Sequence, residues 1–336
     1  ITVVIFFGVK STEHKVSLLS AKNIIEAIDQ NEYNIKLFGI DSDGMWYVLS
    51  HENYLVNADD PSLIKINTAS ASTISNKTVI LEELMGLDVA FPIIHGAYGE
   101  DGSLQGLFKI ADIPFVGSDV ASSAICLDKD FTKRLLKEAG INVAPFKCLN
   151  AYGISEANMS QIINELGLPL FVKPVNQGSS VGVTKVYTLD ELEPALTAAL
   201  CFDSKVIIEA AINGCEIECA ILGNEKPRVS ECGELILQSD YYSYASKYLS
   251  DMSPEILIPA RLDSNTAIRI KDVAVKAYQV LNCAGMARVD FFVTPDNNIF
   301  VNEVNTIPGF TNISMYPKLW MHAGVSYSRL ISELIE

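Results

Sequence analysis

Apolar runs of strand length alternate with polar loops through the N-terminal third of the chain. Residues 1–7 form the first run, and residues 33–40, 45–49 and 89–94 form others. Over 17–29 the apolar residues recur with helical spacing instead. This alternation predicts a mostly parallel α/β sheet covered by helices. In such a sheet, ligands gather at the carboxyl ends of the strands.

The length and composition limit the protein classes that are compatible with this start. A chain of 336 residues is long enough for two or three domains. With 49% hydrophobic residues it has too much to bury for a disordered chain, and a net charge of -16 argues against binding of nucleic acid. The longest apolar runs are too short to span a membrane. We therefore expect a cytoplasmic protein with no membrane partner, whose scattered cysteines are reduced thiols.

The middle of the chain predicts a small α+β unit. Residues 128–140 have an acidic start and a glycine stop, which favours a helix, and we expect Lys133 to be an exposed charge on it. Thr188 and Glu191 have the spacing of a capping box and predict a helix through about residue 199. Residues 205–224 predict a hairpin that turns at an Asn-Gly pair.

The C-terminal third contains one long segment without apolar periodicity. Residues 238–255 are rich in Tyr and Ser, and loops of this length in compact domains are usually lids or binding loops. Residues 266–281 predict a helix, residues 285–310 predict two strands joined by a turn, and residues 318–335 predict a closing helix.

The two strands predicted within 285–310 are mostly apolar, but each contains acidic or amide side chains. Alternation places Glu303 and Asn305 on one face, and the turn brings Asp290 opposite them. Carboxylate and amide oxygens are the ligands that Mg²⁺ prefers, and buried carboxylates without partners would be costly. A strand pair held by a salt bridge to Arg288 explains the same residues equally well.

The loop over 176–182 is the second candidate for chemistry. It follows a strand that carries Lys173. Its glycines let backbone N–H groups approach an anion, while Ser179 and Ser180 add hydroxyl donors. These features suit a phosphate-binding loop, although a plain hairpin turn would also have this composition.

Eight motifs in this order resemble the ATP-grasp superfamily and, within it, the D-alanine–D-alanine ligases. The resemblance covers essentially the whole chain, and it departs from the usual pattern at Val9, where a second glycine is typical. The motifs are STEHKVSLLSA (11–21), HGAYGEDGSLQG (95–106), DK (128–129), VKPVNQGSSVGV (172–183), EIECAILG (216–223), YYSYASKY (241–248), GMARVDFF (285–292) and NEVNTIPGFTNISMYP (302–317).

The resemblance implies a fold and a reaction. The fold is a Rossmann-like, parallel α/β domain over 1–125, followed by a two-part ATP-grasp fold over 126–222 and 223–336, with the lid at 238–255. The reaction is the ATP-dependent ligation of two D-alanines into D-alanyl-D-alanine for cell-wall synthesis, through a D-alanyl phosphate. A homodimer and two Mg²⁺ ions, which Mn²⁺ could replace, are also implied.

The resemblance also implies an ATP site between the two parts of the ATP-grasp fold. Its phosphate-binding lysines would be Lys129, Lys173 and, on the lid, Lys247. The residues expected around ATP and the metal ions are Ser179, Ser180 and Val181 over the phosphates, Glu209, Ala211 and Ile212 at adenine, Glu216 at ribose, and Asp290, Glu303 and Asn305 as metal ligands.

Further residues are implied at the two amino-acid sites. Glu13 would pair with the ammonium of the first substrate, and His95, for which a structural role is the alternative, would lie beside it. The remaining roles are an oxyanion hole from Arg288 and the Gly309 N–H, a carboxylate contact from Ser314, a side-chain pocket at Met315, and a lid latch in which Tyr248 bonds with Ser179 and Glu13.

The motifs also bear on two alternative functions. A ligase of the same family that makes D-alanyl-D-serine or D-alanyl-D-lactate fits the same motifs. A non-catalytic ATP-binding protein would be expected to have lost the lysines or the metal ligands, and all of them are present here.

Overall fold

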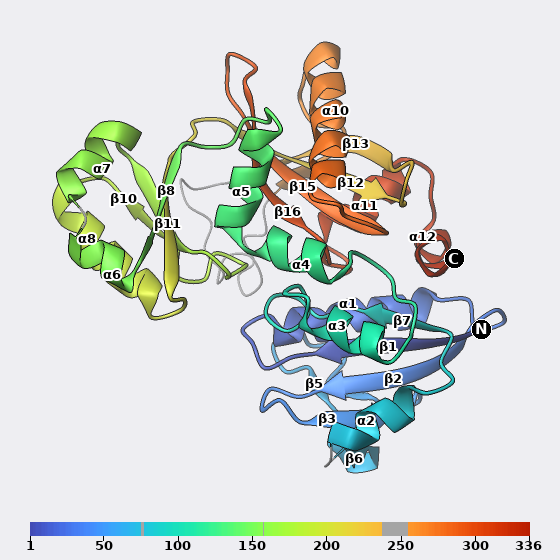
Figure 1. Ribbon diagram of the computed structural model, residues 1–336. Helices are drawn as coiled ribbons and strands as arrows, with labels where there is room; N and C mark the ends of the chain where they lie inside the picture. The colour runs from blue at the N-terminus through green and yellow to red at the C-terminus, as the bar shows by residue number, and fades with distance from the viewer. Residues whose placement is uncertain (75–76, 157, 237–254) are drawn as a thin grey trace.

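Three sheets organise the protein. The structure is a computed structural model that describes residues 1–74, 77–156, 158–236 and 255–336. Figure 1 shows an N-terminal region in blue, a central region in green and a C-terminal region in orange and red, each built around one larger sheet. No helix among these described residues combines the length and apolar character needed to cross a membrane.

The N-terminal sheet is mixed, and its order is β6-β3-β2-β1-β7. The central strand β1 (Thr2–Gly8) pairs in parallel with β2 (Asn34–Ile40) and β7 (Val89–Pro92), as the alternation predicted. β3 (Trp46–Leu49) and β6 (Ser72–Ile74) are added antiparallel. The remaining elements are α1 (His14–Ala27), β4 (Leu55–Val56), β5 (Lys65–Ile66), the 3-10 helix η1 (Thr68–Ser70), α2 (Lys77–Leu84) and α3 (Ser103–Ile110).

The parallel core of this sheet brings two loops together. The carboxyl ends of β1 and β7 are neighbours, so the loops that follow them share one edge. Ser17 of α1 joins these ends, because its Oγ accepts a hydrogen bond from Gly8 N–H at 2.8 Å and donates one to Ile93 O at 2.5 Å.

The central sheet is antiparallel, and its order is β10-β9-β11-β8. Its helices pack on one face, around Leu170, Val172, Val206 and Ile208. The opposite face carries Lys173 and Glu209. The elements are β8 (Phe146–Asn150), α6 (Ala151–Glu156), α7 (Met159–Leu166), β9 (Leu170–Pro174), β10 (Thr184–Val186), α8 (Leu189–Leu200) and β11 (Lys205–Ala210).

The C-terminal sheet has the order β14-β13-β12-β15-β16. One of its faces packs on α10, which begins two residues before the predicted segment and ends one residue before its end, and the other borders the candidate site. The elements are β12 (Cys215–Leu222), β13 (Arg228–Ile236), β14 (Glu255–Leu257), α10 (Ser264–Val280), β15 (Met286–Val293), β16 (Ile299–Asn305), α11 (Met315–His322) and α12 (Tyr327–Ile335).

Two helices connect the N-terminal sheet to the rest. They are α4 (Val120–Leu127) and α5 (Lys129–Glu138), which follow one another with Asp128 as the cap between them. Cys126 and Leu136 of these helices pack in the core of the C-terminal sheet, together with Tyr278 and Val301. Figure 1 shows α4 and α5 lying between the three regions.

The predicted hairpin over 205–224 is wrong. β11 pairs with β8 and β9, whereas β12 pairs with β13 and β15, so the two strands belong to different sheets. The chain crosses between sheets at the Asn-Gly pair. Gly214 packs so tightly on β15 that a Cβ there would lie 2.6 Å from Val293 O. The chain therefore passes from the central sheet to the C-terminal sheet between β11 and β12.

Two smaller expectations also change. The closing helix is divided into α11 and α12, because Gly324 between them has a φ of +86°, outside the helical range. α8 is present, but Thr188 makes no capping hydrogen bond with its side chain. Glu191 instead accepts one from the N–H of Tyr187, at 2.7 Å.

Several other expectations are confirmed. Helix α5 ends before Gly140, which has a φ of +72°, as the glycine stop predicted. The seven cysteines are free thiols. Of the predicted lid, only the last residue, Glu255, is described, so Lys247 and Tyr248 lie outside the described residues.

Candidate active site

A cluster of buried charges lies on the open face of the central sheet. Glu209 of β11 pairs through Oε2 with Lys173 Nζ at 2.7 Å and through Oε1 with Lys133 Nζ at 3.2 Å. Burial alone would raise the pKa of Glu209, but the two lysines lower it to about 2. Burial lowers the pKa of Lys133 against the pull of Glu209. Two cations therefore share one carboxylate.

Lys133 corrects the expectation of an exposed helix charge. Its side chain is 1% exposed and reaches between the sheets, with Nζ 3.4 Å from Asn302 O of β16. On α5 it shares the inward face with Leu136, while Phe131 and Leu135 of the same helix point to solvent. The spacing of Lys133 three residues before Leu136 is the sequence signal that was available for this burial.

The loop between β9 and β10 has an unusual backbone. Ser179 and Ser180 have φ values of 50° and 61°, and Gly182 has 68°. Left-handed backbone is uncommon for serine, and such residues cluster at functional sites. Lys129 reaches this loop, because its Nζ donates to Gln177 O at 2.6 Å. β9 ends at Pro174 and β10 begins at Thr184, so the connection is longer than a plain hairpin turn, and its role in ligand binding stays a prediction.

Glu13 joins the N-terminal region to this loop. It stands at the N-cap position of α1, in the loop that follows β1, where its side chain makes no capping hydrogen bond. Its Oε1 instead accepts a hydrogen bond from Ser179 Oγ. Two glycines make room for its carboxylate. A Cβ at Gly96 would lie 2.5 Å from Glu13 Oε2, and a Cβ at Gly178 would lie 3.2 Å from it. Either side chain would displace Glu13, so its position depends on both loops.

His95 lies in the loop that follows β7, and its side chain is buried, with 5% of its surface exposed. Its Nδ1 is 3.0 Å from Ile307 O and its Nε2 is 3.2 Å from Ser20 Oγ. Burial lowers its pKa, which the nearby charge of Glu13 opposes. The ring thus has both nitrogens engaged, and it connects the N-terminal region to the segment after β16.

Glu100, in the same loop after β7, also connects the N-terminal region to the segment after β16. Its Oε2 accepts from Gly96 N–H at 2.7 Å, and its Oε1 accepts from Ile307 N–H at 3.3 Å. Burial, with the charges of Glu13 and Glu303, raises its pKa to about 8. Glu100 was not among the site residues predicted from the sequence. Its place in a polar loop after a buried strand was the one sequence feature that pointed to it.

Arg288 lies among carboxylates on the facing C-terminal sheet. Its Nε is 2.9 Å from Glu218 Oε2, and its guanidinium holds both oxygens of Asp290, at 2.7 and 2.6 Å. Burial opposes the charge of Arg288, yet Asp290 and Glu218 raise its pKa well above the ordinary value. Glu218 was not predicted as a site residue, although strand alternation places it on the same face as Glu216, which was.

The predicted metal ligands meet on one strand pair. Asp290 is paired with Glu303, and Arg288 with Asn305, in the register of β15 and β16. Asn305 Nδ2 donates to Asp290 Oδ2 at 3.0 Å. A cavity of about 60 Å³ opens here, lined by Glu216, Glu218, Asp290 and Glu303 among others. The salt bridge from Arg288 to Asp290, which the alternative interpretation predicted, is present.

These oxygens are not yet arranged as a metal cage. Within the described ranges, no three His, Cys, Asp or Glu side chains are grouped so that they could hold an ion. The guanidinium of Arg288 donates a hydrogen bond to the carboxylate of Asp290, and Asn305 directs its amide nitrogen toward the same carboxylate. The donors fit Mg²⁺ in kind, because carboxylate and amide oxygens are hard ligands.

Gly309 and Ser314 lie against one another after β16. A Cβ at Gly309 would lie 2.6 Å from Ser314 Oγ. That hydroxyl accepts from Thr311 N–H at 3.0 Å and is 2.8 Å from Thr311 Oγ1. Met315 is 4% exposed and packs on Gly233, where a Cβ would lie 2.6 Å from its Sδ. Met315 therefore contributes to the core beneath this segment.

The residues expected around adenine and ribose lie where the chain crosses from β11 to β12. Ala211 and Ile212 are half-buried at this crossing, and Ala211 N–H donates to Pro169 O at 3.1 Å. Glu216 is half-buried on β12 and lines the cavity beside Glu303. Val181 is half-buried in the loop after β9.

The comparisons with known proteins agree along the whole chain. Two family models match, D-ala D-ala ligase N-terminus over residues 2–118 and D-ala D-ala ligase C-terminus over residues 135–336. The D-alanine–D-alanine ligase of Proteus mirabilis is 51% identical over 343 residues, covering 99% of this chain and 94% of that relative.

Solved structures show the same relationship. The VanG D-Ala:D-Ser ligase from Enterococcus faecalis has a TM-score of 0.85 and 39% identity, covering 99% of this chain and 98% of that one. The D-alanine-D-alanine ligase from Coxiella burnetii has a TM-score of 0.80 and 35% identity, covering 100% of this chain and 94% of that one.

Proposed function

The chain belongs to the D-alanine–D-alanine ligase family, and we propose that it joins two D-alanines into D-alanyl-D-alanine while ATP is cleaved to ADP and phosphate. One observation of the site carries the proposal. Against the effect of burial, Glu209 and then Glu303 and Glu216 raise the pKa of Lys173, so this lysine of the cation-rich face lies within electrostatic reach of the carboxylate-rich face. Glu216, Asp290 and Glu303 of that face line one cavity. Phosphates and their counter-ions need such a pair of surfaces.

The chemistry needs ATP because a carboxylate is a poor acyl donor. An oxygen of the first D-alanine carboxylate attacks the γ-phosphorus, and the bond to the β-phosphate oxygen breaks, which releases ADP. The amine of the second D-alanine then attacks the acyl carbon, loses a proton, and phosphate leaves. The site must hold both amino acids in place and keep water from the acylphosphate.

The phosphates would be bound by the loop and two of the lysines. Lys129 and Lys173 supply positive charge, while Ser179, Ser180 and the N–H of Val181 supply donors over the phosphates. Lys173 has a raised pKa, because Glu209 outweighs the effect of burial, so it stays charged at neutral pH. Adenine would lie by Glu209, Ala211 and Ile212, and the ribose by Glu216.

The amino acids would be bound where the three regions meet. Glu13 would pair with the ammonium of the first D-alanine, with His95 beside it. Arg288 and the Gly309 N–H would stabilise the oxyanion of the tetrahedral intermediate. Ser314 would bind the carboxylate of the second D-alanine. Lys247 and Tyr248, from the segment outside the described residues, are proposed as the lid contacts to phosphate and to Ser179.

Mg²⁺ would be held by Asp290, Glu303 and Asn305, with Mn²⁺ as a substitute. When bound, two such ions would neutralise charge on the β- and γ-phosphates. The donor set is suited to them, provided that Asn305 turns its amide oxygen toward the cation.

The second substrate is proposed to be D-alanine rather than D-serine or D-lactate. Met315 is buried in the core directly after Ser314, so the surroundings of this segment are apolar and offer no strong partner to a D-serine hydroxyl. Because apolar surfaces reject an added hydroxyl only about a hundredfold, D-serine should react poorly but detectably. The D-Ala:D-Ser ligase among the structural relatives makes this alternative worth testing directly.

The test is phosphate release with D-alanine alone, followed by product analysis in an equimolar mixture of D-alanine, D-serine and D-lactate at neutral pH. Mostly D-alanyl-D-alanine is expected. Predominant D-alanyl-D-serine or D-alanyl-D-lactate would move the protein to the alternative activity. No phosphate release with D-alanine would remove the ligase proposal.

The setting of this activity is also a proposal. The dipeptide would serve peptidoglycan precursor synthesis, in the cytoplasm, and the protein would act as a homodimer, as the family resemblance implies. Sedimentation equilibrium across a concentration series tests the dimer.

A further inference from the structure

The two elements proposed to bind the ATP phosphates come from separate parts of the fold. Lys129 begins α5, whose core residues pack on the C-terminal sheet. The loop over 176–182 leaves β9 of the central sheet. A shift of one sheet against the other would therefore separate the lysine from the loop, unless another contact fixes their relative position.

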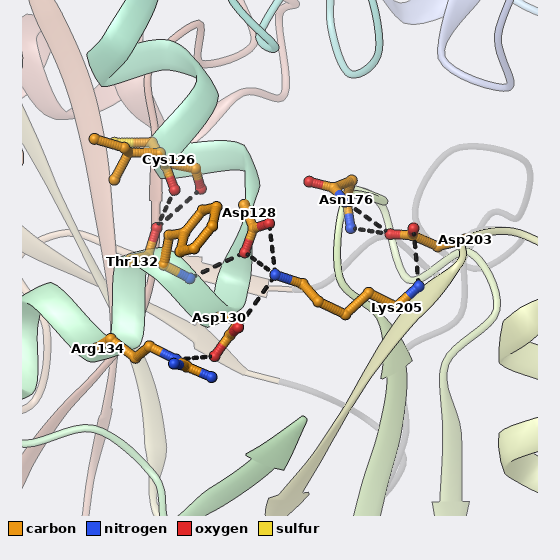
Figure 2. A network of polar contacts seen from close by, with 10 residues as sticks. Cys126, Asp128, Asp130, Thr132, Arg134, Asn176, Asp203 and Lys205 are labelled. Carbon is orange, nitrogen blue, oxygen red and sulfur yellow. Dashed lines mark hydrogen bonds and ion pairs between the residues drawn. The ribbon is translucent and has the colours of Figure 1, made fainter. Parts of the chain in front are cut away.

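Lys205 makes a contact of this kind. It is the first residue of β11, and its Nζ pairs with Asp128 Oδ2 at 2.9 Å and with Asp130 Oδ2 at 3.1 Å. The same Nζ lies 4.4 Å from the centre of the Phe131 ring. Figure 2 shows the Lys205 side chain reaching from the central sheet to the first turn of α5, between the two aspartates. These aspartates flank Lys129 in sequence.

The backbone around Lys205 also holds the phosphate loop. Asp203 Oδ2 accepts from the N–H and from Nδ2 of Asn176, at 2.7 and 2.9 Å. Asp203 Oδ1 accepts from Lys205 N–H at 3.2 Å. Lys205 O accepts from Val175 N–H at 3.1 Å. Figure 2 shows Asn176 and Asp203 beside Lys205, so one strand end is connected to both the loop and the helix.

Lys129 completes the connection from its own side. Its N–H is 3.3 Å from Val175 O, and its Nζ donates to Gln177 O at 2.6 Å. The lysine and the loop thus face one another across the junction that Lys205 spans.

The ion pairs of Lys205 are shielded enough to act as a fixed contact. The side chains are 27% exposed for Lys205, 12% for Asp128 and 4% for Asp130. Burial opposes the charge of Lys205, but its hydrogen bonds to the two aspartates raise its pKa, so it is cationic at neutral pH. Solvent-exposed pairs are weak because water competes for them, and this cluster excludes much of that water.

We propose that Lys205 is a positioning residue for the nucleotide triphosphate. It joins Asp128 and Asp130 at the start of α5 to the strand that anchors Asn176, and so sets the distance between Lys129 and the phosphate loop. This inference rests on the proposed function only for the identity of the ligand as ATP. Lys205 itself touches no substrate in it.

The test is nucleotide binding by titration calorimetry, with magnesium, on the full-length protein. The probes are a non-hydrolysable ATP analogue and adenosine. Lys205→Met is expected to weaken the ATP analogue about tenfold, the usual order for losing a charge-assisted hydrogen bond, and adenosine by less than about twofold. Lys205→Arg should restore the analogue affinity to within about threefold of the parent.

A matched control comes from the same sheet. Lys147 of β8 pairs with Glu165 at 2.7 Å, away from the loop, and its side chain is 32% exposed. Lys147→Met should leave both affinities unchanged. In steady-state assays, Lys205→Met should raise KM for ATP while changing KM for D-alanine and kcat by less than about threefold.

Two results would overturn the inference. One is equal weakening of the ATP analogue and adenosine, which general destabilisation would produce. The other is unchanged affinity for the analogue in a folded Lys205→Met protein. Should that variant fail to fold, Asp203→Ala tests the same connection at the loop, where at least a threefold loss for the analogue is expected and no loss contradicts it.

The outcomes separate this inference from the proposed function. If the parent protein binds the ATP analogue but releases no phosphate with D-alanine, the ligase proposal fails and the positioning role stands. If phosphate release with D-alanine is normal and Lys205→Met binds the analogue like the parent, only the positioning role fails.

Discussion

The two faces that border the candidate site have opposite excesses of charge. At the face of the central sheet, Lys173 of β9 and Lys133 of α5 share the single carboxylate of Glu209. On the C-terminal sheet, the single guanidinium of Arg288 lies between Glu218 and Asp290, with Glu303 beside them. Cations outnumber carboxylates on the first face, and carboxylates outnumber cations on the second.

This difference explains how a chain of net charge -16 can bind a triphosphate. The positive charge needed for the phosphates is concentrated on one buried face, where it is screened less than at the surface. Under the proposed function, the opposite face would supply oxygen ligands for the counter-ions. Each excess is costly without ligand, and binding of a magnesium–nucleotide complex would relieve both.

The largest effect is expected from neutralising the carboxylate-rich face. Glu303→Gln keeps the shape of the side chain but removes one charge, and should reduce D-alanine-dependent phosphate release by about a thousandfold, the order found when a main electrostatic contact to a transition state is lost. The fold should remain intact by circular dichroism. Full activity of this variant, or activity in excess EDTA, would contradict the metal assignment.

Removing a cation from the opposite face should mainly affect stability. Lys133→Met leaves Glu209 with one partner instead of two and is expected to lower the free energy of unfolding by about 3 kcal/mol, since breaking a buried pair is costly. Urea denaturation at pH 7 measures it. The control is Lys271→Met, whose pair with Glu231 is largely solvent-exposed, with side chains 24% and 48% exposed. It should cost less than about 1 kcal/mol, and equal losses in both variants would show that burial does not set the difference.

The pH dependence of stability should reveal the same cluster. The pKa of Glu209 is about 2 in the folded protein against an ordinary 4.5, so folding favours its charged form. Its contribution is complete above about pH 4.5 and is lost as the pH falls through 2, a change on the order of 3 kcal/mol. Denaturation midpoints between pH 7 and pH 3 should fall less steeply for Glu209→Gln than for the parent. Parallel curves would remove this group from the acid response.

The smallest effect concerns the contact that joins the N-terminal region to the loop over 176–182. Ser179→Ala loses the hydrogen bond to Glu13, worth about 1 kcal/mol, and should lower kcat/KM for D-alanine about fivefold. In combination with Glu13→Gln, the two losses should not add, because they remove one interaction. Additive losses would show that Ser179 acts independently of Glu13.

The site could be predicted unevenly from the sequence. The strand pair of β15 and β16 is local, with a short turn, so alternation alone placed Asp290 opposite Glu303. The burial of Lys133 depends on Glu209, which lies far away in sequence, and helix spacing could not reveal that partner. Glu218 and Glu100 carried only weak local signals, because their importance comes from Arg288 and Ile307, which approach them from other elements.

By itself the sequence determined the elements that nearest neighbours specify: the parallel strands β1, β2 and β7, the helix stop at Gly140, and the motifs that carry the family resemblance. Only the tertiary structure decided which strands share a sheet. The Asn-Gly pair before β12 satisfies the local geometry of a hairpin, yet β11 finds its partners in β8 and β9, and β12 finds them in β13 and β15. The physical reason is that turn residues limit the backbone over a few positions, whereas strand pairing and the burial of a charge depend on long-range contacts that no short stretch of sequence contains.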